Sequence, residues 1–362
     1  MLNEYRPRDR TNPACGSPVR VCVFTGSGLA MAGMALVAGV VALMIHDPGV
    51  GEAEMPLGRF HRQPSQITAL SFAPDGRSLA VGRVDGSLEV QDPTRGRPRE
   101  FETGSEAPIQ SITYSPDGKL LASAGPGSEV KIWDTTTGQP LMTLTGHTGT
   151  VCSVAFSLDG KFLASGAIDG RVRLWDLADG QERAILAGHT DKVLGLAFAP
   201  DGRALVSSSF DGTIKLWDMA DGRERSTLLD ERGQRRVYGL AFAPDGRTLA
   251  FGLGASKGGD NGRIVLWDFI KGAETARTPG HSSFTTLGFA PDGRTLASAG
   301  GDCVVRLWDA STGEDRGILT GHDGFIDSIA FSPDGRTLAT GGQDSLLGLY
   351  EFDPEDRRTH NL

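Results

Sequence analysis

Two stretches of the chain carry almost the same alternation of apolar and polar residues. They are residues 146–176, GHTGTVCSVAFSLDGKFLASGAIDGRVRLWD, and residues 188–218, GHTDKVLGLAFAPDGRALVSSSFDGTIKLWD. Side chains on a strand point alternately to its two faces, so the alternation predicts short strands. The Asp-Gly pairs between the apolar runs are typical of tight turns that join antiparallel strands. Each stretch therefore predicts a small antiparallel sheet.

The same pattern recurs along most of the chain. The aspartate of the first turn occurs seven times, 42 to 47 residues apart, at Asp75, Asp117, Asp159, Asp201, Asp245, Asp292 and Asp334. A second position, near the end of each repeat, holds all five tryptophans of the chain and is occupied by Gln91, Trp133, Trp175, Trp217, Trp267, Trp308 and Tyr350. A nearly fixed period of this length is the signature of a repeat architecture.

These motifs resemble the WD-repeat β-propeller family. The pair GH stands at residues 146–147, 188–189, 280–281 and 321–322, and WD at 133–134, 175–176, 217–218, 267–268 and 308–309. The resemblance covers residues 55–353 and implies an all-β fold of seven four-stranded antiparallel blades. The last repeat lacks a fourth strand, whereas residues 55–61 precede the first repeat. We therefore expect residues 55–61 to pair with residues 346–352 and to complete the seventh blade, which would remove an exposed edge.

An uncharged segment, residues 21–45, precedes the repeats. As a helix it would extend about 37 Å, which is enough to cross a hydrocarbon core of about 30 Å, so a single transmembrane helix is predicted. Arg6, Arg8, Arg10 and Arg20 precede it, whereas acidic residues follow it. The positive-inside rule then makes residues 1–20 a cytoplasmic tail, residues 46–54 a linker, and the propeller extracytoplasmic. A cleaved signal peptide is the alternative. Residues 354–362 form a C-terminal tail.

Composition and motifs narrow the possible functions. The chain has 362 residues and a formal net charge of −9, without a block of like charge, which argues against nucleic acid as a partner. It contains no CxxC or HExxH motif and no GxxxxGK[ST] phosphate loop. We therefore expect neither a metal site nor a cofactor.

Four repeats carry His, Ser or Thr, Asp and an aromatic residue at matched spacing. The sets are His147, Ser165, Asp169 and Trp175; His189, Ser207, Asp211 and Trp217; His281, Ser298, Asp302 and Trp308; and His322, Thr340, Asp344 and Tyr350. A Ser-His-Asp set is also found in hydrolases, but a nucleophile needs one activated site and not four equivalent copies. We therefore expect no catalytic residue and no enzyme. The resemblance implies that each set is a structural hydrogen-bond relay. The first, second and fifth repeats depart from this pattern.

The resemblance also places the loops before the inner strands and the turns before the WD strands on one rim, which binds proteins or peptides in this family. The fifth repeat is unusual at both places, with DERGQRR at residues 230–236 and a long glycine-rich turn at residues 252–262. Such loops are where function is added to a repeat. The predicted partner-binding rim consists of Lys192, Phe210, Arg232, Arg235, Arg236, Lys257, Phe325 and Gln343.

The sequence thus predicts a membrane-anchored, non-catalytic scaffold that binds a protein or a peptide. The alternative is an extracytoplasmic propeller enzyme or a small-ligand sensor that uses the mouth of the channel. Convergent acidic, basic or metal-binding residues on one rim would favour the alternative over the scaffold.

Overall fold

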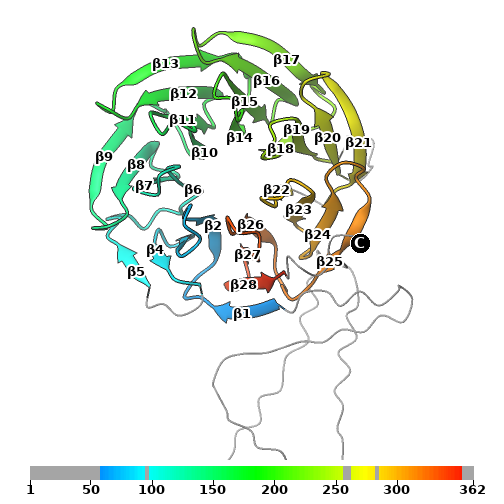
Figure 1. The fold of residues 1–362 in the computed structure, drawn as a ribbon. Helices are drawn as coiled ribbons and strands as arrows, with labels where there is room; N and C mark the ends of the chain where they lie inside the picture. The colour runs from blue at the N-terminus through cyan, green and yellow to red at the C-terminus, as the bar shows by residue number, and fades with distance from the viewer. Residues whose placement is uncertain (1–57, 94–97, 256–261, 282–284, 353–362) are drawn as a thin grey trace, which may run out of the picture.

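Seven four-stranded antiparallel sheets stand around a central channel (Figure 1). The computed structural model describes residues 58–93, 98–255, 262–281 and 285–352. Within each sheet the first strand lies nearest the channel and the fourth on the outer edge of the ring. The predicted all-β propeller of seven blades is confirmed.

The strands follow the repeats in order. Blade 1 contains β2 (Ile67–Phe72), β3 (Leu79–Arg83), β4 (Leu88–Gln91) and β5 (Arg99–Phe101). Blade 2 contains β6 (Ser111–Tyr114), β7 (Leu120–Ala124), β8 (Glu129–Asp134) and β9 (Pro140–Thr145). Blade 3 contains β10 (Val151–Phe156), β11 (Phe162–Ala167), β12 (Arg171–Asp176) and β13 (Glu182–Ala187). Blade 4 contains β14 (Val193–Phe198), β15 (Ala204–Ser209), β16 (Thr213–Asp218) and β17 (Glu224–Asp230).

The remaining blades have the same order. Blade 5 contains β18 (Val237–Phe242), β19 (Thr248–Leu253), β20 (Arg263–Asp268) and β21 (Ala273–Pro279). Blade 6 contains β22 (Thr285–Phe289), β23 (Thr295–Gly300), β24 (Val305–Asp309) and β25 (Asp315–Leu319). Blade 7 contains β26 (Ile326–Phe331), β27 (Thr337–Gly342), β28 (Leu346–Glu351) and, from the other end of the chain, β1 (Gly58–Arg62).

Strand β1 closes the ring. It pairs with β28 in antiparallel register, with Phe60 opposite Gly348. The ring of Phe60 lies edge-on to His322, 5.4 Å between centroids, and edge-on to Tyr350, 5.7 Å between centroids. The start of the described chain is therefore joined to its last strand by backbone hydrogen bonds and by packing, as the sequence predicts for these two segments.

The predicted transmembrane helix at residues 21–45 lies outside the described residues, as do the tails at residues 1–20 and 354–362, the linker at residues 46–54, and residues 55–57 of the predicted closing strand. Among the described residues, no helix is both long and apolar enough to cross a membrane.

The core lies between neighbouring blades. One cluster joins Ala122, Val130 and Ile132 of blade 2 to Val151 and Leu163 of blade 3, all of them completely buried. The other clusters are built in the same way across the next blade boundaries. A single sheet on its own would leave its apolar faces exposed. Each blade is therefore stabilised by the two blades beside it.

The turns between the second and third strands need a left-handed residue. Gly170 and Gly212 supply it in blades 3 and 4, with φ of 73° and 88°, whereas Ser128 and Ser345 adopt φ of 60° in blades 2 and 7. A side chain is disfavoured in this conformation.

We expect Ser345→Gly to raise the free energy of unfolding by about 0.5–1 kcal/mol, because relief of the left-handed strain outweighs the greater freedom of glycine in the unfolded chain. Chemical denaturation would measure the change. Gly170→Ser is the reciprocal control and should be destabilising. Equal stability of Ser345→Gly and the wild type would contradict the argument.

Candidate binding rim

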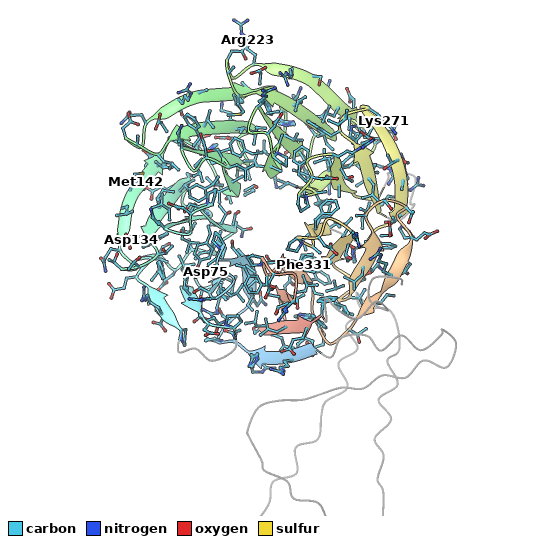
Figure 2. All side chains as sticks on the ribbon, viewed as in Figure 1. Asp75, Asp134, Met142, Arg223, Lys271 and Phe331 are labelled. Carbon is cyan, nitrogen blue, oxygen red and sulfur yellow. The ribbon has the colours of Figure 1, made fainter. Side chains whose placement is uncertain are left out.

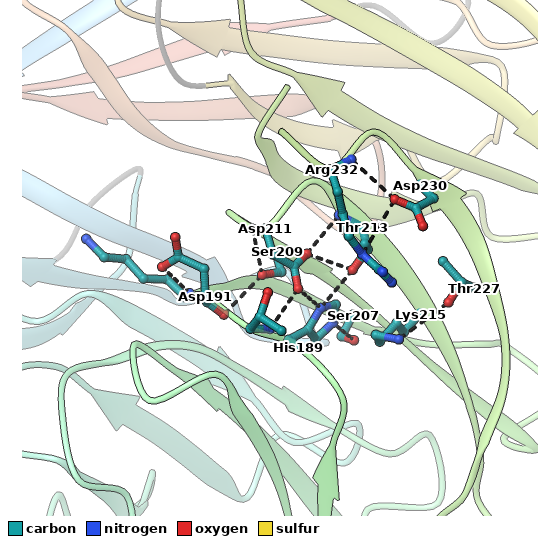
Figure 3. Close-up of polar contacts among 12 residues, drawn as sticks. His189, Asp191, Ser207, Ser209, Asp211, Thr213, Lys215, Thr227, Asp230 and Arg232 are labelled. Atoms are coloured by element: carbon teal, nitrogen blue, oxygen red, sulfur yellow. Dashed lines mark hydrogen bonds and ion pairs between the residues drawn. The ribbon is translucent and has the colours of Figure 1, made fainter. Parts of the chain in front are cut away.

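The polar network of blade 4 begins at the loop that precedes its inner strand (Figure 3). His189 Nδ1 lies 3.1 Å from Asp211 Oδ2, and its Nε2 lies 2.7 Å from the Ser207 hydroxyl. The Trp217 indole N–H donates to the same hydroxyl at 2.8 Å, and the Thr213 hydroxyl donates to Asp211 at 2.7 Å. The chain of contacts ties the loop, the turn and the third strand of the blade together.

The relay is present in two further blades as the sequence predicts. In blade 3, His147 contacts Asp169 at 3.0 Å and Ser165 at 2.8 Å, and the Trp175 indole N–H donates to Ser165 at 2.8 Å. In blade 6 the same contacts are made at 2.6–2.9 Å by residues His281, Asp302, Ser298 and Trp308.

Blade 7 differs at the last step. His322 contacts Asp344 at 2.8 Å and Thr340 at 2.7 Å. The Tyr350 hydroxyl donates to the Thr320 carbonyl at 3.1 Å, and the Thr340 side chain is its second hydrogen-bond partner. A phenol carries its polar group at the tip of the side chain, so it reaches the loop before the inner strand. Blade 7 therefore has a bond to the loop backbone in addition to the contact with Thr340.

The repeats without a complete relay use other contacts. In blade 1 the buried Arg83 forms an ion pair with the buried Glu89 and donates to Gln63 at 2.6 Å. In blade 5 no described residue accepts a hydrogen bond from the Trp267 indole N–H. Phe251, which is 1% exposed, takes the position of the hydroxyl residue there.

Burial sets the charge state of the relay. Burial lowers the pKa of His147, although its contact with Asp169 acts in the opposite direction. Burial raises the pKa of Asp211, but the hydrogen bonds from His189, the Thr190 amide and Thr213 outweigh it and hold the pKa well below its usual range. Asp211 is therefore a carboxylate, and the hydrogen-bond donors around it belong to neighbouring residues of the same blade. This arrangement fits a structural role.

Phe210 is the centre of a cluster on the rim of blades 4 and 5. The Arg236 guanidinium lies 4.0 Å from the centroid of its ring, and the Lys192 ammonium lies 5.4 Å from it. Tyr238, on the inner strand β18, contacts the same ring edge-on, 6.1 Å between centroids. The Phe210 amide also donates to the Lys192 carbonyl at 2.9 Å, which fixes the turn against the loop. We call Lys192, Phe210, Arg236 and Tyr238 the rim cluster.

The rim cluster carries charge that the described residues do not neutralise. Arg236 and Lys192 are both exposed, and no described carboxylate forms an ion pair with either of them. Each is held at the aromatic face by a cation–π contact. A guanidinium stacked on a ring keeps the N–H donors along its edge available for a carboxylate or phosphate.

The other predicted rim residues are not all in this cluster. Arg232 lies 3.5 Å from Asp230, and Arg235 donates to the Gly254 carbonyl at 2.8 Å. Phe325 and Gln343 lie together in blade 7, where the Gln343 amide donates to the Phe325 carbonyl at 2.8 Å. Lys257 lies outside the described residues. The structure thus divides the predicted rim into a cationic part at blades 4 and 5 and a separate part at blade 7.

Sequence reasoning missed two residues on the inner strands. Tyr238 belongs to the rim cluster, and Asp327 of β26 lies beside Gln343, whose side-chain amide is 3.5 Å from its carboxylate. Both occupy the second position of an inner strand, one residue after Val237 and Ile326. Alignment of the seven inner strands would have shown a tyrosine and an aspartate at this position.

Among the described residues, no group of three or more His, Cys, Asp or Glu side chains could hold a metal ion. A groove of about 620 Å³ lies on the opposite rim, between the first turns of blades 3 and 4, and is lined by Leu158, Phe162, Pro200 and Met219 among others. None of the predicted rim residues lines it.

The ring of seven blades and the His–Ser–Trp contacts in blades 3, 4 and 6 define a WD-type β-propeller. Two family models match the chain. The model of the first β-propeller of IFT122 matches residues 108–355, which is more than half of the chain, and the model of the WD domain, G-beta repeat, matches residues 55–92. The chain belongs to the WD-repeat β-propellers. No curated protein matches it. Propellers of this family generally act as scaffolds that bind proteins.

Proposed function

We propose that the chain is a membrane-anchored scaffold that binds an acidic segment of a partner protein on the rim of blades 4 and 5. The observation that carries the proposal is the rim cluster, in which Arg236 and Lys192 are held against the ring of Phe210. The cluster combines an aromatic anchor with two cations that no described carboxylate neutralises. Aromatic residues and arginine dominate the binding energy of protein interfaces.

The chemistry of the cluster favours an anionic peptide group. Because the stacked Arg236 presents a fixed fork of donors, a carboxylate can bind it in two places at once. Lys192 adds a second positive charge from the neighbouring loop. Tyr238 extends the surface toward the channel, where the side chain next to the acidic residue can pack. The scaffold is non-catalytic in this proposal.

The membrane anchor is residues 21–45, with the N-terminus in the cytoplasm and the propeller outside it. Support comes from the sequence alone, through the length of the uncharged segment and the arginines before it. Proximity labelling from a ligase fused to the C-terminus of the full chain tests the compartment and identifies the neighbouring proteins together. Labelling of cytoplasmic proteins would contradict the orientation but not the rim.

The variant Phe210→Ala with Arg236→Glu should reduce labelling of the partner about tenfold or more, because it removes the aromatic anchor and reverses one charge. Arg236 is exposed and Phe210 is half-buried at the rim, outside the core between the blades, so the melting temperature should stay close to that of the wild type. Arg223→Glu makes the same charge change at an exposed turn on the outer edge of blade 4 (Figure 2) and is the matched control. Equal labelling by both variants would refute the assignment of the rim.

A further inference from the structure

The outer strands of the seven blades differ in charge. Six of them carry at least one Asp, Glu, Lys or Arg side chain: β1, β5, β13, β17, β21 and β25. Strand β9 of blade 2, PLMTLT, carries none. Each outer strand is hydrogen-bonded on one side only, so the other side presents unpaired N–H and C=O groups. Charged side chains are a common protection of such edges against pairing with another strand.

Strand β9 lacks the glutamate that begins the outer strands of blades 3 and 4. In blades 3 and 4 the first residue of the outer strand is Glu182 or Glu224, which lies opposite the tryptophan of the third strand. Glu182 forms an ion pair with Arg173, and Glu224 forms one with Lys215 at 2.7 Å. In blade 2 the residue opposite Trp133 is Pro140.

Lys131 is the residue of blade 2 that corresponds to Lys215. It lies opposite Thr143, as Lys215 lies opposite Thr227. Lys131 donates to the Thr103 carbonyl at 2.6 Å and lies 5.8 Å from the centroid of the Trp133 ring, but no described carboxylate pairs with it. Blade 2 thus keeps the cation of the pair and lacks the acid that would charge its edge.

The side chains along β9 suit a strand-to-strand contact. Leu141 is 51% exposed, and Thr143 and Thr145 are exposed on the same face. Met142, on the other face, marks the position of β9 on the outside of the ring (Figure 2). Leucine and threonine in such positions can pack against a neighbouring strand without burying a charge.

We infer that β9 is a dimerisation edge, at which β9 of a second copy of this chain pairs with it in antiparallel register. A strand that pairs with an uncharged edge should itself be extended and uncharged. The second copy's β9 has both properties. A two-fold axis through Thr143 places Thr143 opposite its own copy and Met142 opposite Leu144 of the copy, so no charge faces another charge. The inference is independent of the proposed rim.

The geometry predicts a weak dimer with two open rims. One pair of six-residue strands covers less than the roughly 1,200 Å² of ordinary stable complexes, so association should depend strongly on concentration. The rim cluster belongs to blades 4 and 5, away from β9 in blade 2 (Figure 1). A dimer joined at β9 therefore presents two copies of the rim cluster, which would increase the avidity for a partner with two acidic segments.

Cross-linking of the full chain tests the register. Directly opposed residues in antiparallel strands have Cα atoms about 4.5–5.5 Å apart, which a disulfide can bridge. The variant Thr143→Cys should therefore form a covalent dimer under mild oxidation. Thr227→Cys, at the same position of the charged strand β17, is the matched control and should stay monomeric, apart from any cross-linking through the native cysteines that both variants share. Equal yields of dimer from both variants would overturn the inference.

Charging the edge should abolish the dimer. When Pro140→Glu and Leu141→Arg are added to Thr143→Cys, β9 begins with the Glu-Arg pair of blades 3 and 4, and the new glutamate can pair with Lys131. We expect the covalent dimer to be lost without a decrease in melting temperature. Sedimentation of Leu141→Lys alone provides the same test if the double change impairs folding. A dimer that survives both changes would overturn the inference, as would a Thr143→Cys dimer that contains a different protein.

Discussion

Replacing His189 with alanine is expected to lower the free energy of unfolding by about 2–3 kcal/mol. The imidazole, which is completely buried, connects Asp211 to the Ser207 hydroxyl, and Thr213 also contacts it at 3.0 Å (Figure 3). Removal of the ring leaves the Asp211 carboxylate without one donor and opens a cavity beside Trp217. Both effects are costly in a buried site, because water cannot reach all the groups left unpaired.

Urea denaturation of the full chain measures the loss. The control is His61→Ala on β1, where the side chain is exposed, and it should change the stability by less than about 0.5 kcal/mol. Because neighbouring blades support one another, the effect of His189→Ala should appear in the unfolding of the ring and not in blade 4 alone. A His189 variant as stable as the His61 variant would show that packing, and not the relay, holds this blade.

Periodic features of the sequence predict the fold well. The matched spacing shows that the four His, Ser or Thr, Asp and aromatic sets are equivalent, and the resemblance to WD-repeat propellers implies that each set is a hydrogen-bond relay. The pairing of β1 with β28 follows from a count of strands, since the last repeat lacks its fourth. These inferences combine the length of the repeat and the alternation of side chains with what the resemblance to WD-repeat propellers implies.

Features that depend on a departure from the repeat are harder to predict. The bond of Tyr350 to the Thr320 carbonyl depends on the length of the tyrosine side chain. The ion pair between Arg83 and Glu89 depends on two residues of blade 1 that both differ from those at the same positions of other blades. The stacking of Arg236 on Phe210 joins two blades. The sequence places both residues on one rim, but only their side-chain conformations bring the guanidinium to the ring.

The partly buried carboxyl of Asp327 lowers the stability of the folded protein when it is ionised. Burial raises its pKa to about 6 against the lowering effect of the hydrogen bond from Gln343, and the negative charge of Asp344 adds to the rise. No described cation forms an ion pair with it. The carboxylate form is therefore less stable in the folded protein than in the unfolded chain, where the ordinary pKa is 3.8. The free energy of unfolding should fall as the pH rises from about 4 to about 6.

The variant Asp327→Asn should remove this cost. An amide keeps the size and the polar character of the side chain but cannot ionise, so we expect a gain of about 1–2 kcal/mol at pH 7.5, discounted for the part of the side chain that water reaches. The gain should be much smaller at pH 4, where Asp327 of the folded wild type is protonated and the carboxyl of the unfolded chain is only partly ionised. Denaturation curves at pH 4, 5, 6 and 7.5 measure this dependence. Asp323→Asn, in the exposed part of the same loop, makes an equal change of net charge and is the control. If Asp327→Asn gave the same gain at every pH, the burial of a charge would not be the cause.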